Sequence, residues 1–150
     1  MDDFSIKPGF PNMYGLLGGA ANAIAPGKRM LSAMTPTIIE REGKLLMVVG
    51  TPGGSTIITS VFQTILNVLA HGMSMSEAVA APRFHHQWYP EDIQHEPGAF
   101  SDAVIEALRA KGHPLRERSA YGRVDAILVT KDGRLEGAGD PRGDDWAAGF

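Results

Sequence analysis

Two spacings of apolar residues along the chain predict its first secondary structure elements. Apolar and β-branched residues dominate positions 35–40 and 45–49, and Arg41-Glu42-Gly43 separates the two runs, which predicts a β-hairpin that ends at Gly50. After the hairpin, apolar residues recur every three or four positions until Gly72, which predicts a helix with Ser55 as its N-cap. The apolar positions of this helix are Ile57, Ile58, Val61, Phe62, Ile65, Leu66 and Leu69.

The rest of the pattern predicts further helices and strands that neither alternate strictly nor segregate. A short helix begins at Ser74 or Ser76 and ends before Pro82, and the chain is then extended as far as Pro90. Another helix begins after Ser101 and ends at Gly112. Short strands are predicted at 93–96, 115–118, 125–130 and 134–138. This order favours an α+β fold in which helices cover one side of a mixed sheet layer.

The first 35 residues differ from the rest, because they are rich in Gly, Pro and Asn and show neither helical nor strand periodicity. Irregular segments of that length within compact domains are usually functional or disordered. The chain of 150 residues suits one structural unit with a sizeable core. We therefore interpret residues 1–150 as one structural unit that is incomplete alone and comes from something larger.

Composition and charge exclude several classes of partner. The formal net charge is -3, and the basic residues are scattered, so the surface offers no basic stripe for nucleic acid. No apolar stretch approaches the roughly 20 residues of a spanning helix, so the chain carries no membrane address of its own. The sequence has no cysteine, hence neither disulfides nor thiolate ligands, and the compartment must be inferred from elsewhere.

The segment Gly50-Thr51-Pro52-Gly53-Gly54-Ser55 joins the predicted hairpin to the N-terminus of the predicted helix and is the first candidate for chemistry. Unpaired N–H groups and the positive end of the helix dipole meet at such a junction and favour an anion. The anion could be a phosphate or the oxyanion of acyl transfer, and a purely structural turn would use the same glycines. A Walker-type phosphate loop is disfavoured, because no Lys-Ser or Lys-Thr follows the glycines.

Acids and a serine in the irregular segment offer polar contacts for a ligand. Asp2 and Asp3 could receive an ammonium group, although a solvated surface pair is the commoner arrangement. Ser32 leads directly into the first predicted strand and could present its hydroxyl to a ligand. A capping or turn serine is equally compatible with this position.

Three histidines invite a metal or a catalytic interpretation, and both are weak. His85 and His86 are adjacent in an extended segment, so they point to opposite faces, and no acid stands near them or His95 at ligand spacing. A catalytic triad of Ser55, His86 and Asp140 lacks the pattern of a nucleophile elbow. We therefore expect no metal site and no bound cofactor.

Seven ordered sequence blocks resemble one family, the γ-glutamyltransferases (γ-glutamyltranspeptidases or glutathione hydrolases). The blocks span almost the whole chain: Met1-Asp2-Asp3-Phe4-Ser5, Tyr14 to Ala23, Pro26 to Ser32, Thr35 to Ile38, Gly50 to Ser55, Ala81 to Trp88 and Gly137 to Arg142. Members of this family are N-terminal-nucleophile hydrolases that cleave themselves into a large and a small subunit. The resemblance implies that residues 1–150 are the C-terminal part of the small, catalytic subunit. It also implies a four-layer αββα sandwich in the complete enzyme, of which this chain supplies only the C-terminal portion.

The resemblance implies a role for each of five residues in γ-glutamyl hydrolysis and transfer. Asp3 would bind the α-ammonium group of the substrate, Ser32 would bind its α-carboxylate, and the backbone N–H groups of Gly53 and Gly54 would form the oxyanion hole. Ala33 stands where the family usually has a second serine, which puts the substrate preference in question. His85, His86 and Trp88 would serve packing and not catalysis.

The nucleophilic threonine of the family would lie upstream of the first block, so we expect this chain alone to be inactive. The implied partners are a γ-glutamyl substrate, the large subunit and the N-terminal part of the small subunit, and an isolated chain would tend to self-associate. The implied compartment is the periplasm or the cell exterior, with the cytoplasm as the alternative. Two other functions stay open: a non-catalytic amino-acid-binding or scaffold chain, and an acylase for cephalosporins or poly-γ-glutamate with an altered pocket.

Overall fold

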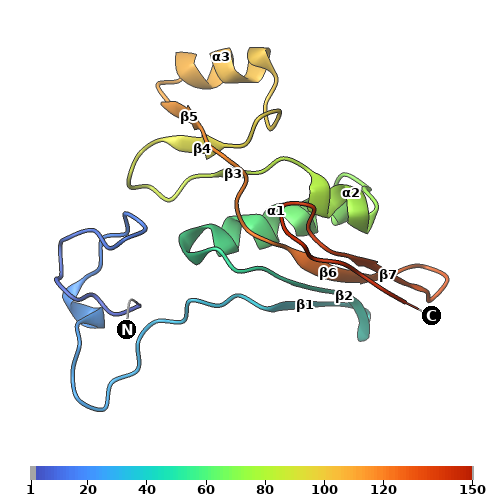
Figure 1. Ribbon diagram of the computed structural model, residues 1–150, viewed down its shortest axis with the longest axis horizontal. Helices are drawn as coiled ribbons and strands as arrows, with labels where there is room; N and C mark the ends of the chain where they lie inside the picture. Colours follow the sequence, from blue (N-terminus) through green and yellow to red (C-terminus); the bar gives the residue numbers. More distant parts are fainter. Residues whose placement is uncertain (1–2, 150) are drawn as a thin grey trace.

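The computed structural model describes residues 3–149, and in them the strands form two separate β-sheets (Figure 1). The larger sheet is antiparallel throughout, in the order β1-β2-β6-β7: Thr37–Arg41, Lys44–Gly50, Asp125–Val129 and Leu135–Ala138. The smaller sheet contains β3 (Phe84–His85), β4 (Ile93–His95) and β5 (Leu115–Glu117). Within it β3 and β4 are antiparallel, whereas β4 and β5 are parallel.

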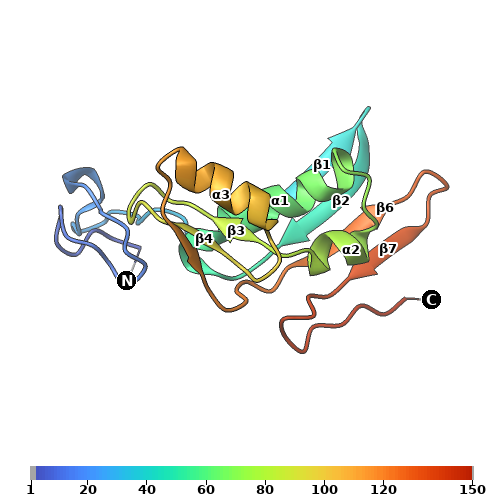
Figure 2. The same cartoon turned by 90° about the horizontal axis from the view of Figure 1, so that it is seen from above.

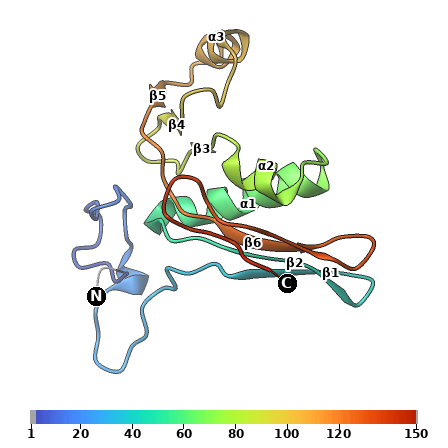
Figure 3. The ribbon, with the colours of Figure 1, turned by 45° about the vertical axis from the view of Figure 1, so that its right-hand side comes forward.

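Helices cover one face of the larger sheet and one side of the smaller sheet (Figures 1 and 3). The helices α1 (Ile57–Leu69) and α2 (Met75–Ala80) pack on the larger sheet, and α3 (Asp102–Ala110) packs beside β5. Short 3-10 turns lie at Ala20–Asn22 (η1) and Gly54–Thr56 (η2). The irregular N-terminal segment lies beyond the N-terminal end of α1, at one end of the molecule (Figure 2).

The hydrophobic core lies between the larger sheet and the two helices above it. The strands and the residue just before β6 contribute Met47, Val49, Val124, Ala126 and Ala138, and the helices contribute Ile57, Val61, Met75 and Val79. The strand residues alternate with exposed ones, as expected for a sheet with one covered face. This core keeps β2 and α1 in fixed relative positions. The junction between them is the segment 50–55, for which the sequence predicts an anion site.

Local sequence signals account for the ends of the helices. The Ser74 hydroxyl accepts from the Glu77 N–H, and the Glu77 carboxylate accepts from the Ser74 N–H, which is a complete capping box for α2. Ser101 caps α3 by accepting from the Val104 N–H. The prediction of Ser55 as the N-cap of α1 is wrong. Gly54 adopts φ +57°, so the chain turns earlier, and Ser55 lies inside η2.

The helices, the hairpin and the short strands confirm the predicted α+β class, but the single mixed sheet layer is wrong. Strand β4 pairs only with β3 and β5 among the described residues and does not join the larger sheet. A buried cluster of charged residues lies where the two sheets approach each other. We name it the charge cluster, and it consists of Arg83, Glu96, Asp140 and Arg142.

The centre of the charge cluster is the ion pair between Arg83 and Asp140, with 2.7 Å between Nη2 and Oδ2. Their side chains are 2% and 0% exposed, so neither charge is compensated by bulk water. Asp140 also accepts from the N–H groups of Val124 (2.7 Å) and Arg142 (3.0 Å). Burial alone would raise the pKa of Asp140, but these N–H groups and Arg83 outweigh burial and hold the pKa below its ordinary value.

A second ion pair extends the charge cluster to β4. Arg142 Nη2 lies 2.5 Å from Glu96 Oε2, and Glu96 also accepts from the N–H groups of Arg83 and Tyr121. Both arginines donate to the Val79 carbonyl at the end of α2. Burial opposes ionisation of Glu96, but Arg142 and the two N–H groups lower its pKa overall. The charge cluster therefore joins α2, the smaller sheet and the chain after β7.

The other face of the larger sheet exposes a row of apolar side chains. Ile38, Val48 and Ile127 are paired across three strands, and they are 67%, 39% and 46% exposed. Leu135 on β7 is also exposed. The C-terminal segment crosses the row at Gly137, where Ala147 approaches. No helix within residues 3–149 has the length and apolar character needed to cross a bilayer.

We expect Asp140→Asn to destabilise the protein that contains this chain by about 3–5 kcal/mol, because it leaves the Arg83 charge buried without its counter-ion. The matched control is Asp132→Asn, which breaks the exposed pair with Arg134 and should cost less than about 1 kcal/mol. Equilibrium denaturation of both variants measures the difference. Equal effects would show that the buried pair contributes no more than a surface pair.

The two carboxylates of the charge cluster, Asp140 and Glu96, predict that stability depends on pH. The pKa values of Asp140 and Glu96 are lowered by folding, so their contribution is present above their unfolded pKa of about 4 and is lost as the pH falls through the lower folded values. The loss of stability below about pH 4 should be shallower in Asp140→Asn than in the unchanged protein.

We also expect residues 1–150 alone to self-associate, because the apolar row on the larger sheet is exposed. Light scattering measures the association. Ile127→Glu places a charge at the centre of the row and should reduce it, whereas Lys131→Glu in the nearby turn should not. A monodisperse monomer that melts cooperatively at high temperature would contradict this expectation.

Candidate functional site

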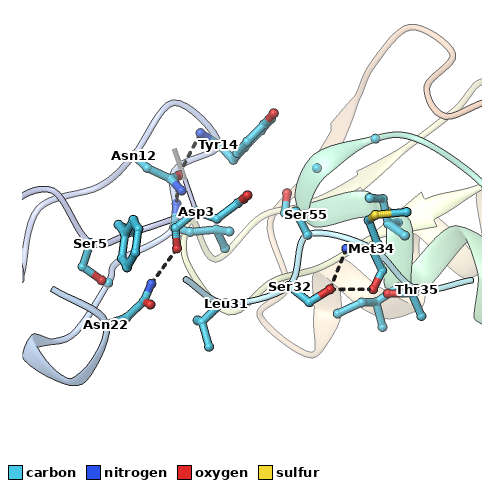
Figure 4. Close-up of a pocket in the computed structure, with 18 of the residues that line it drawn as sticks. Asp3, Ser5, Asn12, Tyr14, Asn22, Leu31, Ser32, Met34, Thr35 and Ser55 are labelled. Carbon is cyan, nitrogen blue, oxygen red and sulfur yellow. Dashed lines mark hydrogen bonds between the residues drawn. The ribbon is translucent and has the colours of Figure 1, made fainter. Parts of the chain in front are cut away.

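A cavity of about 1220 Å³ lies between the irregular N-terminal segment and the junction of β2 with α1 (Figure 4). Three stretches line it: parts of residues 3–22, residues 31–36, and residues 50–58 except Thr56. All five residues singled out from the sequence line this cavity: Asp3, Ser32, Ala33, Gly53 and Gly54. Asp3 and Gly54 are 51 positions apart in the sequence, and the fold brings them to one cavity.

The loop between β2 and α1, residues 50–55, lines the cavity, and we call it the glycine loop. Gly53 and Gly54 have φ values of +146° and +57°, which glycine adopts without a Cβ clash. Within residues 3–149 no acceptor receives the N–H of either glycine, although the Gly53 carbonyl accepts from the Thr56 N–H. The N-terminus of α1 follows directly and adds the positive end of its dipole. This arrangement can stabilise an anion or a developing oxyanion.

Tyr14 packs on this loop and was given no role by the sequence interpretation. A Cβ built on Gly54 would lie 2.5 Å from the Tyr14 ring, so the ring rests directly on the glycine backbone. Tyr14 lies in a turn organised by Asn12, whose side-chain oxygen accepts from the N–H groups of Tyr14 (2.9 Å) and Leu16 (3.0 Å). The glycine at position 54 is the only sequence signal for this contact.

Asp3 lines the cavity from the N-terminal segment, next to Asn22 (Figure 4). Its carbonyl accepts from the Asn22 side chain at 2.6 Å, and the neighbouring Ser5 N–H donates to the Asn22 carbonyl. No donor in the described part of the chain reaches the Asp3 carboxylate, which leaves it available to a ligand. Asp2, the other acid of the predicted pair, lies outside the described residues.

Ser32 and Ala33 line the cavity beside the glycine loop. The Ser32 hydroxyl lies 3.2 Å from both the N–H and the carbonyl of Met34, so it makes a local turn. The turn interpretation of Ser32 is thus confirmed, and its contact with a ligand stays a prediction that its place in the cavity lining allows. Ala33 offers no hydrogen-bonding side chain at the next position.

The structure separates the residues of the weak catalytic triad. Asp140 is enclosed in the charge cluster, whereas Ser55 lines the cavity, so the triad of Ser55, His86 and Asp140 is wrong. His85 is buried and His86 is exposed, as their alternation predicts. Among residues 3–149 no three His, Asp or Glu side chains come together as metal ligands.

A second contact missed from the sequence supports the glycine loop from behind. The Thr51 hydroxyl accepts from the Arg123 N–H at 2.9 Å, and the Gly122 Cα lies 3.8 Å from a Cβ built on Gly53. Residues 121–124 are themselves held by the charge cluster through Tyr121 and Val124. No local sequence pattern predicts this contact, because Thr51 and Arg123 lie about 70 positions apart.

Comparison with known families assigns the chain that forms this cavity to one family. The sequence model of the family described as Gamma-glutamyltranspeptidase matches residues 1–150. The chain belongs to the γ-glutamyltranspeptidase family. The family resemblance found in the sequence blocks is thereby confirmed.

Curated relatives and solved structures agree with this family. The chain is 51% identical over 151 residues to the glutathione hydrolase proenzyme of Escherichia coli, a match that covers 100% of this chain and 26% of that protein. It is similar to the γ-glutamyltranspeptidase of Helicobacter pylori, with 48% identity, a TM-score of 0.90, and 95% and 78% of the two chains covered. A cephalosporin acylase of Bacillus halodurans matches with 26% identity and a TM-score of 0.78, over 86% of this chain and 24% of that one.

These matches confirm the α+β fold of N-terminal-nucleophile type. The chain spans about a quarter of the length of the bacterial glutathione hydrolase proenzymes that it matches. Residues 3–149 supply one helical layer and one main sheet of the expected four-layer αββα sandwich.

We expect Gly54→Ala to displace Tyr14, because the new methyl group would lie 2.5 Å from its ring and the backbone would keep an unfavourable φ of +57°. Chymotrypsin should then cut after Tyr14 faster than in the unchanged protein. Gly50→Ala is the matched control, since a Cβ there meets nothing within 4 Å. Unchanged cleavage in Gly54→Ala would show that Tyr14 does not depend on this glycine.

Proposed function

We propose that the protein containing this chain is a γ-glutamyl hydrolase and transferase that acts on glutathione-like γ-glutamyl amides. The observation that carries this proposal is the shared cavity, which is lined both by Gly53 and Gly54 and by Asp3. Within residues 3–149 the N–H groups of the two glycines have no acceptor and the Asp3 carboxylate has no donor. One feature suits a developing oxyanion and the other suits an ammonium group. The name glutathione hydrolase proenzyme, carried by several relatives, supports the same substrate class.

Each of the five residues has a place in this reaction. The α-ammonium group of the glutamyl donor pairs with Asp3, and its α-carboxylate accepts from the Ser32 hydroxyl. The γ-carbonyl oxygen then points at the N–H groups of Gly53 and Gly54, which stabilise the negative charge it gains when attacked. Ala33 adds no hydrogen bond, so carboxylate recognition depends more strongly on Ser32 and on a cation from outside this chain.

The nucleophile in this proposal is a threonine outside residues 1–150. Its hydroxyl attacks the γ-carbonyl carbon, its own α-amine takes the proton, and the amine leaving group departs with that proton. The γ-glutamyl ester that forms is then cleaved by water or by an acceptor amine. Residues 1–150 alone would lack this nucleophile and would be inactive.

In this proposal residues 1–150 are the C-terminal part of the small subunit. Their partners are the N-terminal part of the same subunit and the large subunit, which fits the proenzyme names and the quarter-length match. We place the complete protein in the periplasm or outside the cell. No cofactor is needed, because the nucleophile and the N–H groups supply the chemistry.

An acylase for a different acyl group is the second candidate, and Ala33 is the residue that favours it. The acylase ACY 1 proenzyme of a Pseudomonas strain is 39% identical to this chain over 127 residues. Asp3 argues against this candidate, since an acyl group without an amine would leave its carboxylate unpaired in the cavity. A non-catalytic scaffold would keep the cavity and show no turnover.

We expect Asp3→Ala to impair a glutamyl donor far more than Ser32→Ala in the complete protein. Loss of Asp3 leaves the substrate ammonium uncompensated, at a cost of about 3 kcal/mol or more, whereas the Ser32 hydrogen bond is worth roughly 1.5–3 kcal/mol. Ala33→Ser should improve glutamyl donors by adding a hydroxyl. The measurement is kcat/KM for each variant with a γ-glutamyl anilide and with the matching glutaryl anilide, which has no α-amine.

Only Asp3→Ala should erase the preference for the glutamyl donor over the glutaryl donor. A preference that survives in Asp3→Ala would remove Asp3 from the ammonium site. A preference of the unchanged protein for the glutaryl donor would favour the acylase. No turnover of either donor by the correctly processed protein would favour the scaffold.

A further inference from the structure

A line of side-chain hydrogen bonds runs from helix α1 to the turn that carries Tyr14. Thr59 on α1 lies 2.8 Å from His85 (Oγ1 to Nδ1), and His85 lies 2.8 Å from Gln87 (Nε2 to Oε1). Gln87 Nε2 then donates to the Tyr14 carbonyl at 2.8 Å. The line joins residues from three separate parts of the sequence, and neither His85 nor Gln87 lines the cavity itself.

The acceptors around Gln87 fix the direction of its bonds to Tyr14 and to His85. Gln87 Nε2 faces two carbonyl oxygens, those of Tyr14 and Tyr89, so this atom must be the amide nitrogen. Gln87 Oε1 therefore faces His85, which must donate from Nε2. The Thr59 hydroxyl also lies 3.1 Å from the Thr56 carbonyl, so its single proton can go to either acceptor. When His85 is neutral, its Nδ1 is the acceptor for this proton. His85 is 2% exposed, and burial lowers its pKa, which favours this neutral form.

The backbone of the turn also packs on the segment that follows Gln87. A Cβ built on Gly15 would lie 3.3 Å from Pro90 Cδ and 3.6 Å from Gln87 Nε2. Gly15 has φ +77°, so the tight approach and the backbone conformation both require glycine. Tyr14 is thus held on two sides: Gln87 binds its carbonyl, and Gly54 lies under its ring.

We propose that Gln87, held in place by His85, is a positioning residue that keeps Tyr14 against Gly54 and so maintains the shape of the γ-glutamyl pocket. This inference rests on the proposed function for its effect on turnover, but its structural part stands without it. Gln87 acts through Tyr14 and does not contact the substrate. His85 contributes by fixing which way the Gln87 amide points.

The first test follows the turn directly in the complete protein, by hydrogen–deuterium exchange. The N–H groups of Tyr14, Gly15 and Leu16 are bonded to Asn12, so their exchange reports opening of the turn. In Gln87→Glu the acceptor for His85 is kept, but an oxygen replaces the donor that faces two carbonyls. We expect exchange at residues 14–16 to be about tenfold faster, the effect of losing hydrogen bonds of ordinary strength. Exchange in β2 and β6 should not change.

The matched control is His86→Ala in the same segment. His86 is exposed, and its only hydrogen bond among the described residues is to the Glu91 carbonyl, at 3.3 Å. It should leave exchange at residues 14–16 and kcat/KM unchanged. Equal acceleration in His86→Ala and Gln87→Glu would overturn the proposal, because the turn would then respond to any change in this segment.

The second test asks whether Gln87 acts through Tyr14. Gln87→Glu should lower kcat/KM for a γ-glutamyl anilide about tenfold in the unchanged background and less than about twofold in Tyr14→Ala. A full effect of Gln87→Glu in the Tyr14→Ala background would overturn the proposal. If the unchanged protein turns over no γ-glutamyl donor, the proposed function fails, while the exchange experiment still decides whether Gln87 holds the turn.

Discussion

Arg83 and Asp140 bring opposite charges into a space that water does not reach, and the fold must compensate both. A buried ion pair is stabilised when further hydrogen bonds satisfy the remaining donors and acceptors. Glu96 and Arg142 complete the charge cluster, and carbonyls at the end of α2 and at Tyr121 accept further arginine N–H groups. Among the described residues only Arg83 Nε in this pair has no acceptor. These requirements explain why the chain passes close to one point at α2, at β4, at residues 121–124 and after β7.

The charge cluster reaches the cavity through one short segment. Residues 121–124 donate to Glu96 and Asp140 on one side, and on the other side the Arg123 N–H donates to Thr51. Thr51 belongs to the glycine loop, and the Gly122 backbone approaches Gly53 in the same loop, so residues 121–124 support this loop. Tyr14 closes the opposite side. The oxyanion hole that we propose would need donors fixed before the reaction, and contacts with Tyr14 and with residues 121–124 hold this loop.

The sequence predicted the elements whose signals are local. The capping serines at 74 and 101, the hairpin turn and the three-four spacing of α1 each depend on neighbours within a few residues. The two-sheet arrangement was not predicted, because it depends on Arg83 and Asp140, which are 57 positions apart. The cavity residues were identified through seven sequence blocks in family order and not from periodicity. Ser55 was misassigned, because the positive φ of Gly54 is not visible in the helical spacing.

The position of the cavity bears on where the other part of the proposed enzyme would pack. The glycine loop lies at the end of β2, and the apolar row on β1, β2 and β6 occupies the face of the same sheet that the helices leave uncovered. A segment that covers this row would run beside β2 and could end near Gly50, at the mouth of the cavity. Burial of the row and delivery of a nucleophile to the glycine loop would then be consequences of a single packing event, since one sheet carries both surfaces.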